Sequence, residues 1–166
     1  DFGWFPKVGS YRYGYSFDAV NHRQGNNEAM SMLVMSFPEL SGGIRAVHAV
    51  RTYDNGRTWE YVRNLNEELV CDFNESSIVA FQEGFIIITR GDDQITRIFH
   101  TDPDFNLLKQ RNLSEQYEAI DYIGRPELFS VDGRHYTLCR NIAKGMSTGT
   151  LQLYSLDPHS LKLTGH

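Results

Sequence analysis

Apolar residues fall along the chain in short runs, each the length of a β-strand, and polar turn residues separate the runs. The runs are rich in β-branched and aromatic residues and are bounded by Gly, Asp and Asn. No segment keeps a 3.6-residue apolar period for three turns, so the pattern indicates almost no helix. The predicted strands are Tyr11–Phe17, Met30–Phe37, Gly43–Tyr53, Ser76–Phe81, Phe85–Arg90, Thr96–His100, Glu127–Val131, Arg134–Arg140 and Thr150–Tyr154.

Two stretches of the chain repeat the same order of features. Residues 74–90 read as strand, acidic-Gly turn, strand and Arg, and residues 124–140 read the same way. The two turn glycines, Gly84 and Gly133, are 49 residues apart. Glu-Gly and Asp-Gly pairs suit tight hairpin turns, because Gly accepts a positive φ without steric cost.

An Asp that follows a strand and opens a turn recurs at a similar spacing. Asp54, Asp102 and Asp157 occupy this position, at intervals of 48 and 55 residues. A period of about forty to fifty residues that holds four strands is typical of β-propeller blades rather than of a sandwich. We therefore predict an all-β propeller of four-stranded antiparallel blades. The predicted blades are roughly residues 11–63, 73–112 and 120–164.

The sharpest motif is the segment Thr52–Trp59, which reads Thr-Tyr-Asp-Asn-Gly-Arg-Thr-Trp. It is similar to the Asp box, Ser/Thr-x-Asp-x-Gly-x-Thr-Trp, of sialidases and related propellers. In such a turn the Asp54 carboxylate accepts N–H groups, Gly56 supplies the unusual φ and Trp59 packs between sheets. The chain thus resembles the sialidase-type propellers, of which three blades form half of a six-bladed ring. Non-enzymatic propellers carry the same folding motif.

A second resemblance concerns chemistry. In bacterial sialidases a Glu opens a strand that is followed by a Gly turn, a second strand and an Arg. Glu75 and Arg90 fill this pattern, fifteen residues apart. The resemblance implies that Glu75 polarises a Tyr nucleophile, for which Tyr122 and Tyr136 are candidates, and that Arg90 grips a substrate carboxylate. Arg125 and the Pro after it resemble the motif of another carboxylate-binding Arg, without its intervening Ile.

Strand geometry predicts where these residues meet. In an antiparallel sheet the start of one strand and the end of the next lie at the same edge. Glu75 and Arg125 are expected to start first strands, and Arg90 and Arg140 to end second strands. All four would then gather on one face of the propeller, opposite the Asp54 turn. Three arginines suit an anionic sugar, since guanidinium binds carboxylate through two parallel hydrogen bonds. The alternative for Glu75 and Arg90 is a structural ion pair at a strand end.

Composition excludes several classes of partner. The net charge of −5 gives no reason to expect nucleic acid. No apolar run approaches the roughly eighteen residues of a membrane span. Cys71 and Cys139 are far apart and outside any metal-ligand spacing, so we expect two core residues rather than a disulfide. The histidines show no metal spacing either, and no cofactor is implied.

The resemblance implies an exo-α-sialidase-like glycoside hydrolase acting on terminal sialic acid or a related acidic sugar. Its Tyr nucleophile would make it an exception to the two-carboxylate rule for glycosidases. The rival interpretation is a non-catalytic propeller that binds glycans or proteins, because the family's acid/base Asp is not recognisable here. The family's usual setting implies a secreted or periplasmic protein.

Three blades do not close a ring, and an open array leaves two edge strands and two sheet faces uncovered. Either the chain is part of a larger propeller, or two copies complete the ring as a homodimer. We favour the larger propeller and expect a dimer if the chain exists alone.

Overall fold

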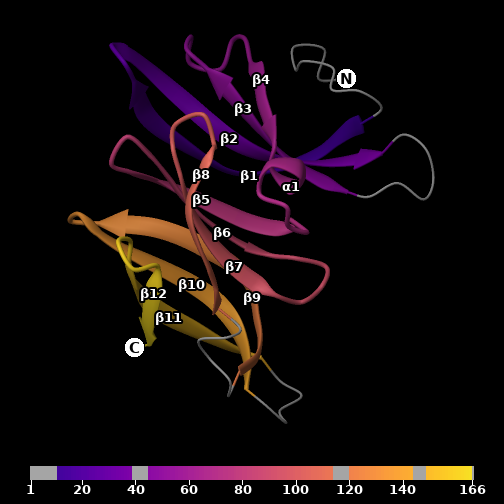
Figure 1. Ribbon diagram of the computed structural model, residues 1–166, viewed down its shortest axis with the longest axis vertical. Helices are drawn as coiled ribbons and strands as arrows, with labels where there is room; N and C mark the ends of the chain where they lie inside the picture. The colour runs from indigo at the N-terminus through magenta and orange to yellow at the C-terminus, as the bar shows by residue number, and fades with distance from the viewer. Residues whose placement is uncertain (1–10, 39–44, 114–119, 144–148, 166) are drawn as a thin grey trace.

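The computed structural model describes residues 11–38, 45–113, 120–143 and 149–165. They form three four-stranded antiparallel sheets, which are three blades of a β-propeller (Figure 1), and this confirms the predicted fold class. The first blade contains β1 (Tyr11–Gln24), β2 (Asn27–Pro38), β3 (Ala46–Thr52) and β4 (Glu60–Asn64). The second contains β5 (Glu75–Phe81), β6 (Gly84–Arg90), β7 (Thr96–Thr101) and β8 (Leu107–Asn112). The third contains β9 (Ile120–Val131), β10 (Arg134–Ala143), β11 (Thr150–Asp157) and β12 (Lys162–Gly165).

Within each blade the strands follow chain order, and each strand pairs antiparallel with the next. The fourth strand of each blade, β4, β8 or β12, is absent from the sequence prediction. These strands are four to six residues long and mostly exposed, because each forms the outer edge of its sheet. They lack the apolar run by which the other strands are recognised.

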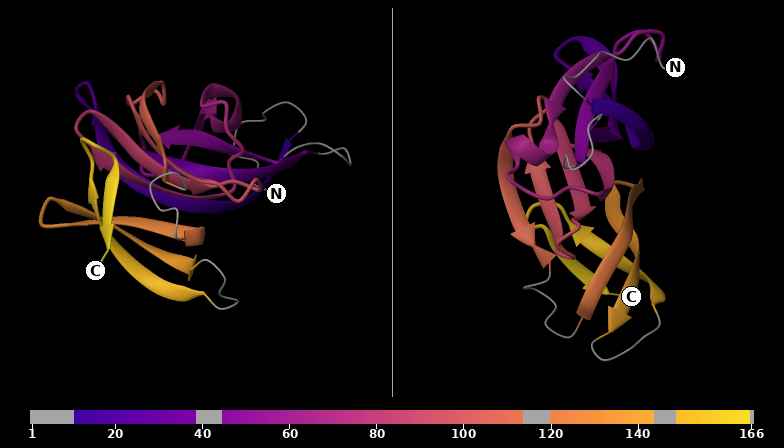
Figure 2. Two further views of the ribbon diagram at one scale, coloured as in Figure 1. Left: turned by 60° about the horizontal axis from the view of Figure 1, so that its bottom comes forward. Right: turned by 90° about the vertical axis from the view of Figure 1, so that its right-hand side faces the viewer.

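The first strands of the three blades lie side by side, with β5 between β1 and β9. The two views of Figure 2 show the first and third sheets on opposite sides of the second. The second blade is therefore packed on both faces. Alternation along β6 reflects this, since Phe85 and Ile87 enter the core shared with the first blade, whereas Ile86 and Ile88 enter the core shared with the third. All four side chains are fully buried, and each contributes about 1.5–3 kcal/mol of burial free energy.

The segment Thr52–Trp59 forms the turn between β3 and β4. The Thr58 amide and hydroxyl donate to the Asp54 carboxylate at 2.8 and 2.6 Å. Gly56 has a φ of +85°, and the Trp59 indole N–H donates to the Gly56 carbonyl at 3.1 Å. The turn therefore has the carboxylate acceptor and the glycine conformation that its sequence predicts.

Two expected strand boundaries are wrong. Arg125 does not start its strand, because β9 begins at Ile120 and Arg125 stands inside it. The register slips there, since Glu127 pairs with Leu138 while Gly124 pairs with Arg140, and Arg125 has a left-handed φ of +45°. Arg140 likewise does not end β10, which continues to Ala143. A β-bulge lets a strand pass through such an irregular Arg-Pro segment, and the sequence pattern does not reveal it.

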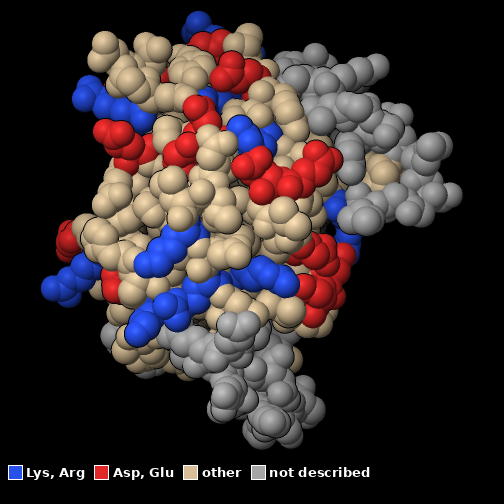
Figure 3. Space-filling view, viewed as in Figure 1, with Lys and Arg blue, Asp and Glu red and all other residues tan. Residues whose placement is uncertain are grey.

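The helix α1 (Leu65–Glu68) is a single turn whose Asn64 side chain accepts from the Asn66 amide. Among the described residues no helix has the length and apolar character to cross a membrane. Cys71 and Cys139 are both free thiols, half-buried and buried, in agreement with the expectation of two separate residues. On the face seen in Figure 3, Lys and Arg form a band across the lower half, with Asp and Glu beside and above it.

Candidate functional site

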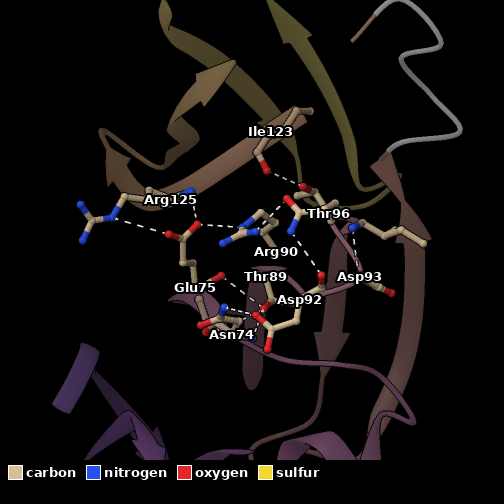
Figure 4. A network of polar contacts seen from close by, with 12 residues as sticks. Asn74, Glu75, Thr89, Arg90, Asp92, Asp93, Thr96, Ile123 and Arg125 are labelled. Atoms are coloured by element: carbon tan, nitrogen blue, oxygen red, sulfur yellow. Dashed lines mark hydrogen bonds and ion pairs between the residues drawn. The ribbon is translucent and has the colours of Figure 1, made fainter. Parts of the chain in front are cut away.

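Glu75 stands at the start of β5 and pairs with Arg90 at the end of β6. The Arg90 Nε donates to Glu75 Oε2 at 2.9 Å, and the two side chains are 11% and 21% exposed. The same oxygen accepts the backbone N–H of Arg125 at 2.9 Å, and Arg125 Nε lies 3.8 Å from Oε1 (Figure 4). One carboxylate on the second blade thus binds arginines of two blades.

The two arginines differ in how much of the guanidinium faces solvent. Arg90 is engaged by Glu75 and also donates to Gln94 Oε1 at 3.0 Å, so it forms the structural ion pair. The Arg125 side chain is 78% exposed and lines a pocket. Arg140 is exposed and lies against Gly149, and the contacts described for Glu75 do not include it. The structure therefore gathers Glu75, Arg90 and Arg125 in one network.

A pocket of about 460 Å³ opens beside this network, at the inner edges of the three blades. A second hollow of about 580 Å³ continues from it along β1, β5 and β9 and shares Phe17, Asp18 and Glu127 with it. The pocket is lined by Ser16, Phe17, Asp18, Arg45, Asn74, Glu75, Ser76, Arg125, Pro126 and Glu127. Each blade therefore contributes one carboxylate to it, and concave sites with convergent charged groups are where ligands bind.

Asp18 reaches the pocket from β1 and is held by the neighbouring blade. Its Oδ2 accepts from the Ser77 hydroxyl and from the Ile78 amide at 3.4 Å. The Ser77 oxygen in turn accepts the Leu128 N–H of the third blade at 2.7 Å. A continuous chain of hydrogen bonds therefore links all three blades beneath the pocket.

Glu127 comes from β9, directly before Leu128. Partial burial raises the pKa of Glu127, and the negative charge of Asp18 raises it further. A carboxyl group that keeps its proton to higher pH than usual is suited to donate it to a substrate. Asp18 and Glu127 thus line the same pocket in different surroundings.

Three residues that line the pocket were not predicted from the sequence: Asp18, Arg45 and Glu127. Asp18 falls one residue beyond a predicted strand, and Glu127 was read only as a strand start. Their approach depends on how blades pack against one another, which no local pattern encodes. A local signal exists, since Asp18 stands between the apolar Phe17 and Ala19, and Glu127 directly precedes the apolar Leu128 and Phe129.

The candidate nucleophile Tyr136 is not among the residues described as lining this pocket. Tyr136 stacks on Phe129 with ring centroids 5.6 Å apart, near the hairpin turn of the third blade. The side chain of Tyr122 lies outside the described residues. The described pocket lining includes no tyrosine. In the part of the chain that the structure describes, no cluster of three His, Cys, Asp or Glu could hold a metal ion.

Comparisons with known proteins identify the fold. No protein-family profile matches the chain, and no curated protein matches its sequence significantly. An exo-β-1,3-galactanase from Clostridium thermocellum aligns with a TM-score of 0.56 and 12% identity, over 82% of this chain and 32% of its own. A β-fructofuranosidase from Bombyx mori aligns at 0.55 and 14%, over 90% and 36%.

An N-acetylgalactosamine deacetylase from F. plautii, solved with blood group B trisaccharide, aligns at 0.59 and 13%, over 96% of this chain and 53% of its own. The chain thus spans about a third to a half of the solved structures that it resembles. At these identities the likeness establishes the fold alone, which is a β-propeller like those of the solved glycoside hydrolases.

Proposed function

We propose that the chain forms the active-site half of a glycoside hydrolase in which Glu127 and Asp18 are the two catalytic carboxylates. The observation that carries the proposal is their convergence on one pocket, with the pKa of Glu127 raised by burial and by Asp18. Most glycoside hydrolases use two carboxyl groups that flank the scissile bond, one of them protonated. A carboxyl group whose pKa is raised is the better candidate for the acid of such a pair.

In this mechanism Glu127 donates its proton to the glycosidic oxygen as the bond to the anomeric carbon breaks. Asp18 faces the sugar as the second carboxylate, oriented by the Ser77 hydroxyl and the Ile78 amide. It acts on the anomeric carbon directly or activates a water molecule, and the distance between the two carboxyl groups selects between these routes. Phe17 supplies an apolar wall against which a sugar ring packs.

The structural neighbours support a carbohydrate substrate. A galactanase, a β-fructofuranosidase and a levansucrase from B. megaterium all share the fold, as does the deacetylase bound to a trisaccharide. Neutral sugars are therefore the first substrates to test.

An acidic sugar is the second candidate, favoured by the exposed Arg125 guanidinium at the pocket. In the sialidase-like form, Arg125, Arg90 and Arg140 hold the substrate carboxylate and Glu75 serves a Tyr nucleophile. Arg90 would have to exchange its bond to Glu75 for one to the substrate. This requirement makes the two-carboxylate mechanism the better supported of the two.

The test is a panel of 4-methylumbelliferyl glycosides that includes β-galactoside, β-fructoside and α-sialoside, on the longest natural form of the protein. Glu127→Gln and Asp18→Asn are each expected to lower kcat on the accepted substrate by about 10²- to 10⁴-fold. Glu83→Gln is the matched control, because Glu83 is an exposed carboxylate in the β5–β6 turn.

Turnover that is lost in both variants and kept in Glu83→Gln supports the proposal. Turnover of the sialoside alone, lost in Arg125→Ala but kept in Glu127→Gln, would favour the sialidase-like mechanism instead. A folded protein that cleaves nothing on the panel yet binds on a glycan array is a non-catalytic propeller, and the proposal fails.

A further inference from the structure

We propose that Ser77 is a positioning residue, whose hydroxyl between Asp18 and the Leu128 backbone fixes the alignment of the two carboxylates across the pocket. The inference rests on the proposed function and goes beyond it, because Ser77 touches neither substrate nor reacting atom. It concerns how a site assembled from three separate sheets keeps its geometry.

Ser77 lies on β5, the inner strand of the middle blade, and is fully buried. Its hydroxyl donates to Asp18 of the first blade and accepts from the Leu128 N–H of the third at 2.7 Å. Both hydrogen-bonding roles of the oxygen are therefore used across blade boundaries. A single atom sets the separation between the strand that bears Asp18 and the strand that bears Glu127.

Glu75, two residues before Ser77 on the same strand, provides a second link between the second and third blades. It accepts the Arg125 N–H at 2.9 Å, while Ser77 accepts the Leu128 N–H. Residues of β5 therefore bind the backbone before and after Glu127, at Arg125 and at Leu128. The left-handed φ of +45° at Arg125 is sterically unfavourable for a residue with a side chain, and such conformations persist where surrounding contacts enforce them.

Ser36 of the first blade provides a contrast. It is also fully buried, but its hydroxyl donates to the Ala46 carbonyl at 3.0 Å and lies 3.2 Å from His48 Nε2, both within its own blade. Ser36 is not among the residues described as lining the pocket. Ser77→Ala and Ser36→Ala therefore delete the same buried group, with and without loss of the link between blades.

Ser77→Ala is expected to lower kcat by about 10- to 100-fold with KM within about twofold, because misplacing a catalytic group by about 1 Å costs about that much. Ser36→Ala should leave both constants near wild type. A ¹³C NMR titration supplies an independent readout, with the Glu127 carboxyl assigned through Glu127→Gln. The other charged groups at the pocket are Asp18, Glu75, Arg45 and Arg125. Ser77→Ala should move the pKa of Glu127 back toward its ordinary value, since Asp18 is no longer held against it.

If Ser77→Ala does not fold by circular dichroism, Ser77→Cys replaces it, because a thiol keeps the volume with a weaker donor. Its kcat should fall between those of wild type and a full loss of the link. An active wild type whose kcat and Glu127 titration are unchanged by either substitution overturns the inference. An inactive wild type in which Ser77→Ala still moves the Glu127 titration overturns the proposed function and supports the positioning.

Discussion

At the scale of single residues, the Glu75 carboxylate holds parts of two blades together. It binds the Arg90 guanidinium of its own blade and the Arg125 backbone of the next, while remaining mostly buried. Buried ions that are paired and hydrogen-bonded are tolerated, whereas removal of one partner leaves an uncompensated charge. The pair therefore has a structural role that does not depend on any bound ligand.

Replacement of Arg90 by Met is expected to lower the free energy of unfolding by about 3 kcal/mol, because it leaves Glu75 buried beside one weaker partner. Urea denaturation monitored by circular dichroism measures this change. Arg45→Met is the control, since the Arg45–Asp92 pair is more than a third exposed on both sides and should contribute less than about 1 kcal/mol. Equal losses in the two variants would contradict the structural role of the Glu75–Arg90 pair.

His48 predicts a separate acid sensitivity. Burial lowers its pKa from 6.5 to about 4, and its Nε2 lies 3.2 Å from the Ser36 hydroxyl. Below pH 6.5 His48 binds a proton in the unfolded chain but stays neutral in the folded protein. Stability contributed by neutral His48 is therefore complete above pH 6.5 and lost as pH falls toward 4, by about 1.4 kcal/mol per pH unit.

The measurement is the free energy of unfolding of wild type and His48→Gln at several pH values from 7 to 4. The difference between them should shrink as pH falls through that window. A difference that stays constant would show that His48 is not held neutral in the folded protein.

Part of the candidate site could be predicted from the sequence. Glu75 and Arg90 were predicted to meet because antiparallel register places a strand start beside the end of the next strand. Arg125 joins the same network because a bulge in β9 places it there, and the local sequence does not predict that bulge. Asp18 and Glu127 approach only through packing between blades, so periodicity and turn motifs could not pair them.

At the scale of elements, turns and inner strands could be predicted from the local sequence, whereas the edge strands could not. The Asp54 turn is specified by its own residues, and the apolar run of β6 is specified by burial on both faces. The polar strands β4, β8 and β12 pair because the preceding strand offers free hydrogen-bonding groups, not because their residues favour it.

The Asp54 turn carries its own pH prediction. Hydrogen bonds from the Thr58 hydroxyl and amide and from Thr52 lower the pKa of Asp54 from 3.8 to about 2. Because the folded pKa lies below the unfolded one, this contribution to stability is present above pH 3.8 and is lost as pH falls toward 2. Asp54→Asn should unfold at lower urea than wild type at pH 5, and the gap should narrow by pH 2.5. A pH-independent gap would mean that the charge of Asp54 does not strengthen the turn.

At the scale of the whole molecule, two cores join three blades, and polar contacts reinforce both junctions. The buried Arg51 of the first blade bonds to Asp104 Oδ1 in a turn of the second at 3.2 Å. Lys109 of the second blade donates to the His159 carbonyl of the third at 2.7 Å. The relative positions of Asp18 and Glu127 therefore depend on the contacts between blades. The Ser77 hydrogen bonds are one of these contacts, and they lie next to the proposed catalytic groups.

If Glu127 is the general acid of a glycosidase, as we propose, its substitution slows departure of leaving groups that need a proton more than of those that do not. Glu127→Gln and wild type are compared on a glycoside with a sugar leaving group and on the matching 2,4-dinitrophenyl glycoside, which departs without a proton. We predict a loss of about 10²- to 10⁴-fold on the first and a far smaller loss on the second. Equal losses on both substrates, or none on either, would contradict the assignment of Glu127.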